Sequence, residues 1–357
     1  MNDAVNDAAV KSFANDISNF AANNVSGRRC SPRSWMFLLL TALVAVSVVS
    51  LLIGAGSIGP RQVLGLLSGS DHAEARFIVW ELRAPRTLIG IAVGVALGVA
   101  GALLQAVSRN PLAEPGLLGV SAGAAFAVSL ALVLGASAAT LRIPVAQLGA
   151  LIGCVCVLSV ARLRDVGNDP VRLVLAGAAF SGLLGSLSAL MLLYDQSAAD
   201  EIRFWVVGSL AGRRLDDLWA VLPSLLVAGA GVVVIARPLA ALALGERAAS
   251  GLGHRPGLIR WLAVGCVALL VGAATAIAGP IAFVGLVVPF VARAIAGPDI
   301  RRTLWFCLPV GPLIVLTADI ISRVVVAPSE LPLGVLTALC GAPVLIAVVR
   351  AKRLPML

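Results

Sequence analysis

The feature that most constrains this chain is a series of long apolar stretches without charge, of which the stretch between Thr87 and Ala106 has the clearest boundaries. It contains 20 residues and no charged side chain. At about 1.5 Å per residue, a helix of that length matches the ~30 Å hydrocarbon core of a bilayer. Asn110 and Pro111 follow it, and a proline cannot continue a helix cleanly. We therefore expect a membrane-spanning helix that is followed by a broken segment.

Four glycines recur along this stretch at intervals of four, four and three residues: Gly90, Gly94, Gly98 and Gly101. That spacing places them on one helix face, where the backbone of a neighbouring helix can approach closely. Close packing of small residues is a main source of helix association in lipid. The pattern predicts a central helix of the bundle.

Composition places the whole chain among polytopic membrane proteins, because 59% of its residues are hydrophobic and only 13% are charged, against roughly a quarter charged in globular domains. Ten spans of ~20 residues in a chain of 357 leave short loops and no room for a separate soluble catalytic domain. We expect an all-α transmembrane bundle of about ten helices. The candidate spans are 35–53, 87–106, 117–134, 145–160, 173–193, 218–236, 262–278, 281–296, 305–321 and 334–349.

The positive charges predict that both termini are cytoplasmic. An even number of spans puts both ends on one side, and with the N-terminus inside, 18 of the 27 lysines and arginines fall in cytoplasmic segments and nine outside. Residues 1–34 are rich in Asn, Asp, Ala and Ser and lack apolar periodicity, so we expect a disordered cytoplasmic tail. Residues 35–357 form the membrane domain.

Several classes of function are disfavoured by residues that the chain lacks. Its two lysines, Lys11 and Lys352, lie in the tails, so there is no Walker A loop for a nucleotide. The net charge of +9 marks topology rather than nucleic-acid binding. The six cysteines have no ligand-like spacing, and we expect no disulfide, no metal site and no cofactor.

Three alternatives to an ATP-driven transporter fit the sequence less well. An ion-coupled carrier usually needs a buried ionisable group near the membrane midplane, but Asp319 lies close to the outer end of its helix. A membrane-embedded enzyme would need a cluster of histidine and carboxylate side chains at one depth, and the sequence offers none. A structural or assembly factor would move no cargo when reconstituted.

Three motifs carry a family resemblance: Arg83-Ala-Pro-Arg86, Gly101 to Gln105, and Arg109-Asn-Pro-Leu-Ala-Glu-Pro-Gly-Leu-Leu-Gly119. They resemble the permeases of type II ABC importers, the FecCD/BtuC-like family, which import ferric siderophores, haem or cobalamin. The similarity extends from about Trp35 to the C-terminus. It implies a multi-pass permease of the cytoplasmic (inner) membrane that works with ABC ATPase subunits, a substrate-binding protein and a second permease copy or a paralogue. The cargo that we expect is a ferric siderophore, with haem or cobalamin as alternatives.

The resemblance implies that Arg83, Arg86 and Arg323 form an outer docking surface, where they meet acidic residues on the two lobes of the binding protein. The sequence also allows other interpretations. The side chains could snorkel toward lipid headgroups, and Arg323 could form an i,i+4 pair with Asp319.

The resemblance also implies a cytoplasmic gate at Asn110 and Leu112, with a companion gate at Asp169-Pro-Val-Arg172, which departs from the small hydroxyl residues of the family. The fifth and tenth spans should line the path with Ser181, Ser186, Ser188 and Thr337. An equally good interpretation is that these hydroxyls bond neighbouring helices.

The largest cytoplasmic loop, residues 239–256, resembles the coupling helix that fits a groove on the ATPase. From its composition alone, an interfacial amphipathic helix is the other interpretation. Glycines should end this short helix. The residues implied in coupling are Leu244, Gly245, Glu246, Ala249, Leu252 and Gly253.

Overall fold

The computed structural model describes residues 31–54, 58–67, 73–135, 138–162, 170–194, 205–327 and 329–350. Most of the predicted tail, up to Cys30, and the loop 163–169 with the companion-gate residue Asp169 lie outside this part. The longer helices are α2 (Pro32–Leu52), α5 (Ala84–Ser108), α6 (Val120–Val133), α7 (Ala138–Arg162), α8 (Pro170–Tyr194), α10 (Leu215–Ala243), α12 (Pro256–Ala278), α13 (Val284–Ala296), α14 (Ile300–Val324) and α15 (Leu333–Arg350). The short elements are α3 (Pro60–Leu67), α4 (Ala73–Phe77), the π-helix η1 (Ile78–Arg83), the 3₁₀ turn η2 (Pro115–Leu118) and α11 (Glu246–Gly251).

Each of the ten predicted spans coincides with one of these longer helices, and the described residues contain no strand. Seven described helices are long and apolar enough to cross a membrane, whereas α6, α13 and α15 contribute shorter apolar helices of 10–17 residues. The all-helical polytopic architecture is therefore confirmed. The count of ten spans and the cytoplasmic termini stay predictions.

The second span is longer than expected, because α4, η1 and α5 form one continuous helix from Ala73 to Ser108. Its π-helical turn ends where the Ala84 N–H donates to the carbonyl of Val79, five residues back. Pro85 follows directly, and a proline ring in a regular helix clashes with the carbonyl four residues earlier. The wider turn gives that ring room, so the helix runs through Pro85 and begins well before Thr87, where the sequence places the start of the span.

The glycine face of α5 does what its spacing predicts. A Cβ built on Gly94 would lie 2.5 Å from the backbone nitrogen of Pro312 in α14, and one on Gly98 would lie 2.6 Å from Cγ1 of Val288 in α13. Gly94 therefore admits the backbone of α14 and Gly98 admits a side chain of α13, and α5 is buried over most of its length. The prediction of a central helix is confirmed.

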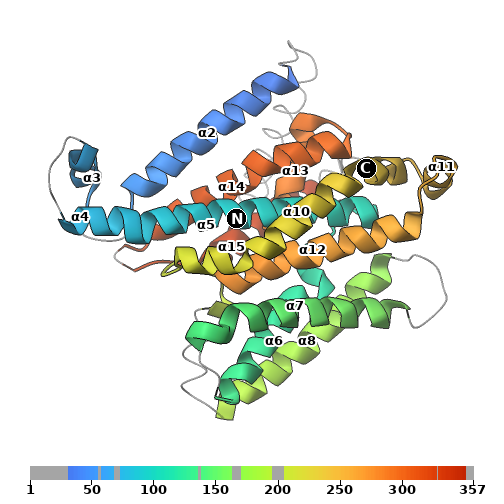
Figure 1. Cartoon of the computed structure of the whole chain (residues 1–357), viewed down its shortest axis with the longest axis horizontal. Helices are drawn as coiled ribbons and strands as arrows, with labels where there is room; N and C mark the ends of the chain where they lie inside the picture. The colour runs from blue at the N-terminus through green and yellow to red at the C-terminus, as the bar shows by residue number, and fades with distance from the viewer. Residues whose placement is uncertain are drawn as a thin grey trace, which may run out of the picture.

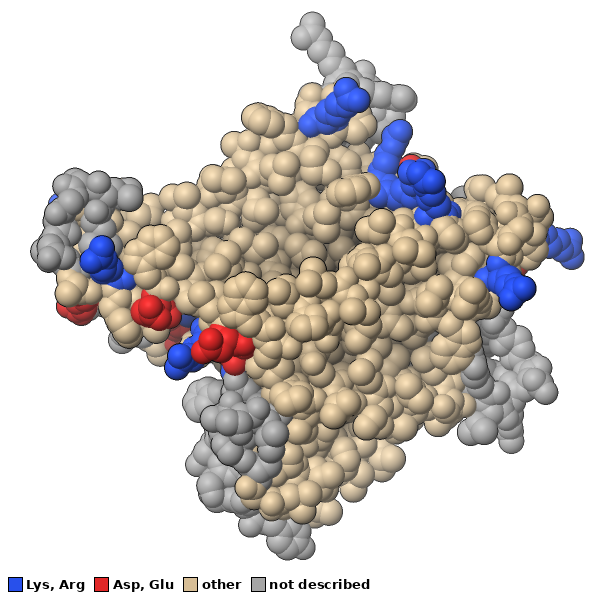
Figure 2. Space-filling model, in the orientation of Figure 1, with Lys and Arg blue, Asp and Glu red and all other residues tan. Residues whose placement is uncertain are grey.

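Figure 1 shows α5, α10, α12 and α14 in the middle of the molecule, with α6, α7 and α8 packed together on one side and α2 on the other. The short helices α3 and α4 lie at one end of the molecule and α11 lies at the opposite end (Figure 1). Charged residues gather toward these two ends and leave an uncharged band between them on the face in Figure 2. Basic residues predominate at the α11 end of this face, as the positive-inside rule requires of a cytoplasmic side.

Candidate functional site

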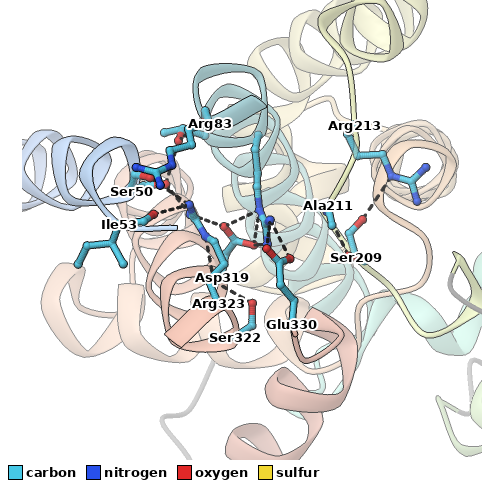
Figure 3. Close-up of polar contacts among 12 residues, drawn as sticks. Ser50, Ile53, Arg83, Ser209, Ala211, Arg213, Asp319, Ser322, Arg323 and Glu330 are labelled. Atoms are coloured by element: carbon cyan, nitrogen blue, oxygen red, sulfur yellow. Dashed lines mark hydrogen bonds and ion pairs between the residues drawn. The ribbon is translucent and has the colours of Figure 1, made fainter. Parts of the chain in front are cut away.

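The three arginines of the predicted docking surface lie together at the end of the molecule opposite α11. Arg83 closes η1, Arg86 lies in the first turn of α5, and Arg323 lies in the last turn of α14. Their side chains are not presented as an open positive surface, because the three residues are only 5%, 9% and 2% exposed. Each guanidinium is used inside the protein (Figure 3).

Two carboxylates neutralise part of this charge. Arg86 donates to Asp319 at 2.7 Å and to Glu330 at 2.8 Å, and Arg323 donates to Asp319 at 2.6 Å. Asp319 is fully buried between the two arginines, whereas the side chain of Glu330 is 27% exposed. A buried carboxylate held by two guanidinium groups is a structural ion pair. The i,i+4 pair of Arg323 and Asp319 is confirmed.

Arg83 and Arg323 also close the C-terminal end of α2. Arg323 donates through Nη1 to the carbonyls of Ser50 and Ile53 at 3.0 and 2.9 Å. Arg83 donates through Nη1 to the carbonyls of Leu51 and Leu52, also at 3.0 and 2.9 Å. The last carbonyls of a helix have no intrahelical donor, and cations at this end are favoured by the helix dipole.

This capping gives a physical reason for arginines on the side that is predicted to face outward, where the positive-inside rule disfavours them. The guanidinium groups donate to backbone carbonyls and to carboxylates within the protein, so they do not extend toward lipid headgroups. The docking role of Arg83, Arg86 and Arg323 stays a prediction, and it now has to account for the burial of all three side chains.

The predicted gate lies in the segment 109–119, where the helix breaks as the sequence indicates. Arg109 adopts a left-handed backbone with φ of 49°, and η2 starts at Pro115. Asn110 forms an Asx turn, because its Oδ1 accepts the Leu112 N–H at 2.9 Å, and the Ala113 N–H donates to the Asn110 carbonyl at 3.1 Å. Asn110 and Leu112 thus belong to one small rigid turn, and both are partly exposed.

Two polar side chains that sequence reasoning did not select hold this turn against α13. Gln105 donates from Nε2 to the Ala113 carbonyl at 3.3 Å, and its Oε1 accepts from Arg293 at 2.6 Å. Glu114 accepts the N–H of Phe283 at 2.6 Å. Burial raises the pKa of the Glu114 carboxyl, and the bond from Phe283 opposes this rise. Gln105 and Glu114 lie inside the motifs that carry the family resemblance, but the sequence alone does not show which groups they contact.

Arg293 is an unusual buried cation. It is 5% exposed, and its Nε and Nη1 atoms have no hydrogen-bond partner among the described residues. Its bond to Gln105 is therefore the contact that ties this charge to the gate segment.

A short helix, α11, forms in the loop that is predicted to couple to the ATPase. It ends in a Schellman motif, in which the Gly253 N–H donates to Ser250 and the His254 N–H donates to Ala249, with Gly253 at φ of 79°. Gly245 precedes the helix at φ of 123°, a conformation that is essentially restricted to glycine. Both glycines are therefore needed for the shape of the loop.

The side chains of this loop divide into an anchored and an open set. Ala249 is fully buried, and Glu246 forms an ion pair with Arg260 of α12. Leu244 and Leu252 are 79% and 64% exposed. Two large apolar side chains at the tip of the molecule offer a surface that a partner or a lipid interface can cover.

The predicted path helices, α8 and α15, lie at the surface of the single chain. Leu183, Leu187 and Leu339 are among their exposed apolar residues. The hydroxyls of Ser186 and Ser188 donate to carbonyls four residues earlier in α8. The hydroxyl protons of the two serines are therefore donated within α8. The alternative in which these serines donate to neighbouring helices is wrong.

Comparison with known proteins adds the family context. Residues 42–351 match the model of the FecCD transport family. The ferric enterobactin transport system permease protein FepD of Escherichia coli strain K12 is 44% identical over 88% of this chain and 94% of its own length. The vitamin B12 import system permease protein BtuC of Klebsiella pneumoniae is 37% identical over 88% of this chain and 92% of its own. A solved inward-facing metal-chelate type ABC transporter shares 29% identity with a TM-score of 0.76, covering 89% of this chain and 99% of that one.

Proposed function

Because this chain belongs to the FecCD transport family, we propose that the cargo it carries across the cytoplasmic membrane is a ferric siderophore. It is a permease subunit of an ABC importer and not an enzyme, and ATP hydrolysis lies in a separate subunit. The observation that carries the choice of cargo is the 44% identity to a ferric enterobactin permease, against 37% to a vitamin B12 permease. Cobalamin is the second candidate.

The proposed assembly is a pair of permeases, two ATPases and one binding protein. The exposed apolar faces of α8 and α15 support the pairing, because a second permease copy or a paralogue would cover them. Between the copies these faces would enclose a weakly polar path with no tight site, as suits a permease that must release its cargo.

At the cytoplasmic end, α11 would fit a groove on the ATPase. The support is geometric: Leu244 and Leu252 face outward while Ala249 and the Glu246–Arg260 pair fix the helix to its own subunit. The turn that holds Asn110 and Leu112 would close the path between the copies. ATP-driven closure of the two ATPases would then tilt the permeases and open this turn.

At the outer end, the binding protein would dock over the arginine cluster. Glu330, whose side chain is 27% exposed, is the partly exposed partner of the nearly buried Arg86, so an acidic side chain of the binding protein would compete with Glu330 for Arg86. Arg83 and Arg323 would then act mainly by holding the end of α2 in place.

The test is reconstitution of the permease in proteoliposomes with its ATPase and binding protein, followed by uptake of an iron-loaded siderophore or of cobalamin. We expect siderophore uptake that requires ATP and the binding protein. Uptake of cobalamin alone would overturn the cargo assignment. Uptake driven by an ion gradient without ATP would indicate a carrier, and no uptake of any cargo would favour an assembly role.

A further inference from the structure

Arg109 connects two parts of the cytoplasmic end that are far apart in sequence. Its Nη2 donates to the carbonyl of Leu242 at 2.9 Å, across 133 positions of the chain. Leu242 lies in the last turn of α10, where carbonyls lack helical donors and a cation is favoured by the helix dipole. The carbonyl is well fixed, since Leu242 is 1% exposed.

The Leu242 carbonyl leads directly to α11. Only Leu244 and Gly245 separate α10 from α11, and the Gly245 N–H also donates to the Leu242 carbonyl at 3.0 Å. At its other end, Gly245 accepts the Ala249 N–H of α11 at 3.0 Å. A displacement of α11 therefore reaches the Leu242 carbonyl through two hydrogen bonds and two residues of chain.

On its other side, Arg109 directly precedes the gate turn, which is the turn that Asn110 forms with Leu112 and Ala113. It is the residue immediately before Asn110, whose N–H donates to the Gln105 carbonyl and whose side chain and carbonyl fix Leu112 and Ala113. Such a hydrogen-bonded turn moves as one body. Arg109 ends α5 in the left-handed conformation, so it lies at the joint between the fixed helix and this body.

We propose that Arg109 is a positioning residue that transmits the movement of α11 to the gate turn through its bond to the Leu242 carbonyl. This inference rests on the proposed transport function, because it assigns a route by which ATP closure reaches the gate. It differs from the general coupling role of α11, because it assigns the link between ATP hydrolysis and gate opening to one hydrogen bond.

The test compares three substitutions in the reconstituted complex. Arg109→Ala removes the side chain. Arg109→Asn also removes its reach, but it suits the left-handed backbone and so separates the contact from backbone strain. Arg109→Lys retains a cationic donor. Arg301→Ala is the matched control, because it removes an exposed arginine at the start of α14.

For Arg109→Ala and Arg109→Asn, we expect ATPase assembly and ATP hydrolysis within twofold of wild type, and cargo transported per ATP lowered about tenfold, as for loss of one charge-assisted hydrogen bond. Arg109→Lys should recover most of this ratio, and Arg301→Ala should keep it. A wild-type ratio in the alanine or asparagine variant would overturn the inference. A parallel loss of assembly and transport would also overturn it and make Arg109 a structural residue.

A second readout does not depend on cargo. In protein whose native cysteines are replaced, Leu112→Cys reports the gate through its rate of modification by a maleimide with and without ATP. We expect ATP to change this rate when Arg109 is present and not in Arg109→Ala. If ATP changes the rate equally in both, the proposed link is wrong. If wild type shows the ATP-dependent change but moves no siderophore, the proposed cargo fails while the link stands.

Discussion

The guanidinium of Arg86 and the carboxylate of Asp319 lie 2.7 Å apart although 233 positions separate them in the chain. This ion pair joins the first turn of α5 to α14 at the end of the molecule opposite α11, and the contact between Gly94 and Pro312 lies further along the same two helices. A buried pair of this kind contributes little net stability, but removing one partner leaves a buried charge. The contacts of Arg83, Arg86, Asp319 and Arg323 therefore fix how α2, α5 and α14 meet.

Asp319→Asn should destabilise the permease strongly, because both Arg86 and Arg323 lose their buried counter-charge. The expected loss is about 3–5 kcal/mol, measured as thermal unfolding of the purified protein in detergent. Glu330→Gln is the control, since that carboxylate is partly exposed and should cost about 1 kcal/mol or less. Equal melting temperatures for the two variants would contradict the role assigned to Asp319.

Arg83→Ala separates helix capping from docking. The carbonyls of Leu51, Leu52 and Ile58 would lose their donor, and we expect the permease alone to lose about 1.5–3 kcal/mol of stability. A purely docking arginine would behave differently. Its removal would weaken binding-protein affinity, most at low salt, and leave thermal unfolding of the permease unchanged.

How much of this arrangement the sequence predicts depends on the range of the interaction. The glycine spacing in α5 is a local pattern and it predicted the central helix correctly. The arginine caps join α2 to residues such as Arg323, which lies 273 positions from Ser50. No local pattern encodes such a pair. Without the end of α2 beside them, these arginines suggested a docking surface, contacts with lipid headgroups or, for Arg323, the local pair with Asp319, and of these the structure shows the local pair.

The same limit applies at the gate. The prolines and Asn110 predicted a broken segment, and the Asx turn follows from local chemistry. Gln105 and Arg293 meet across 188 positions, so the sequence offered a glutamine in a motif and a cytoplasmic arginine without joining them. The early start of the second span was missed because the charges of Arg83 and Arg86 were interpreted as a helix boundary, whereas Arg83 ends the π-helical turn and Arg86 lies in the first turn of α5.

Gly253→Val should impair coupling, because valine at φ of 79° is strained and would disrupt the Schellman motif that ends α11. We expect the variant to insert and fold but to pull down less ATPase and to stimulate less hydrolysis. Gly257→Val is a matched control, since that glycine lies in the first turn of α12 with open space around it. Undiminished ATPase binding by the Gly253 variant would leave α11 as an interfacial helix.

Asn110→Ala should loosen the gate, because the Leu112 N–H loses the acceptor that closes the Asx turn. The expected result is more ATP-independent leak of cargo from proteoliposomes, and Leu112→Ala should act in the same direction. Asn110→Asp keeps the acceptor oxygen and serves as the control. Leak at the wild-type level in all three variants, with transport intact, would return both residues to a packing role.

The contact between Gln105 and Arg293 is best tested by a double-mutant cycle. Gln105→Leu removes the hydrogen-bond acceptor that the described residues offer to the Arg293 guanidinium, which is 5% exposed, so the variant should lose about 3 kcal/mol or more of stability. Arg293→Met leaves the Gln105 Oε1 without a donor and should cost about 1–3 kcal/mol.

Replacing both partners by apolar side chains of similar volume removes the charge together with its acceptor. The double variant should therefore lose less stability than the sum of the two single losses, although the Ala113 carbonyl also loses its donor from Gln105. Thermal unfolding of the four proteins gives the coupling energy directly. Additive losses would mean that Arg293 finds its compensation elsewhere, and that the tie between α13 and the gate turn runs through Glu114 and Phe283 instead.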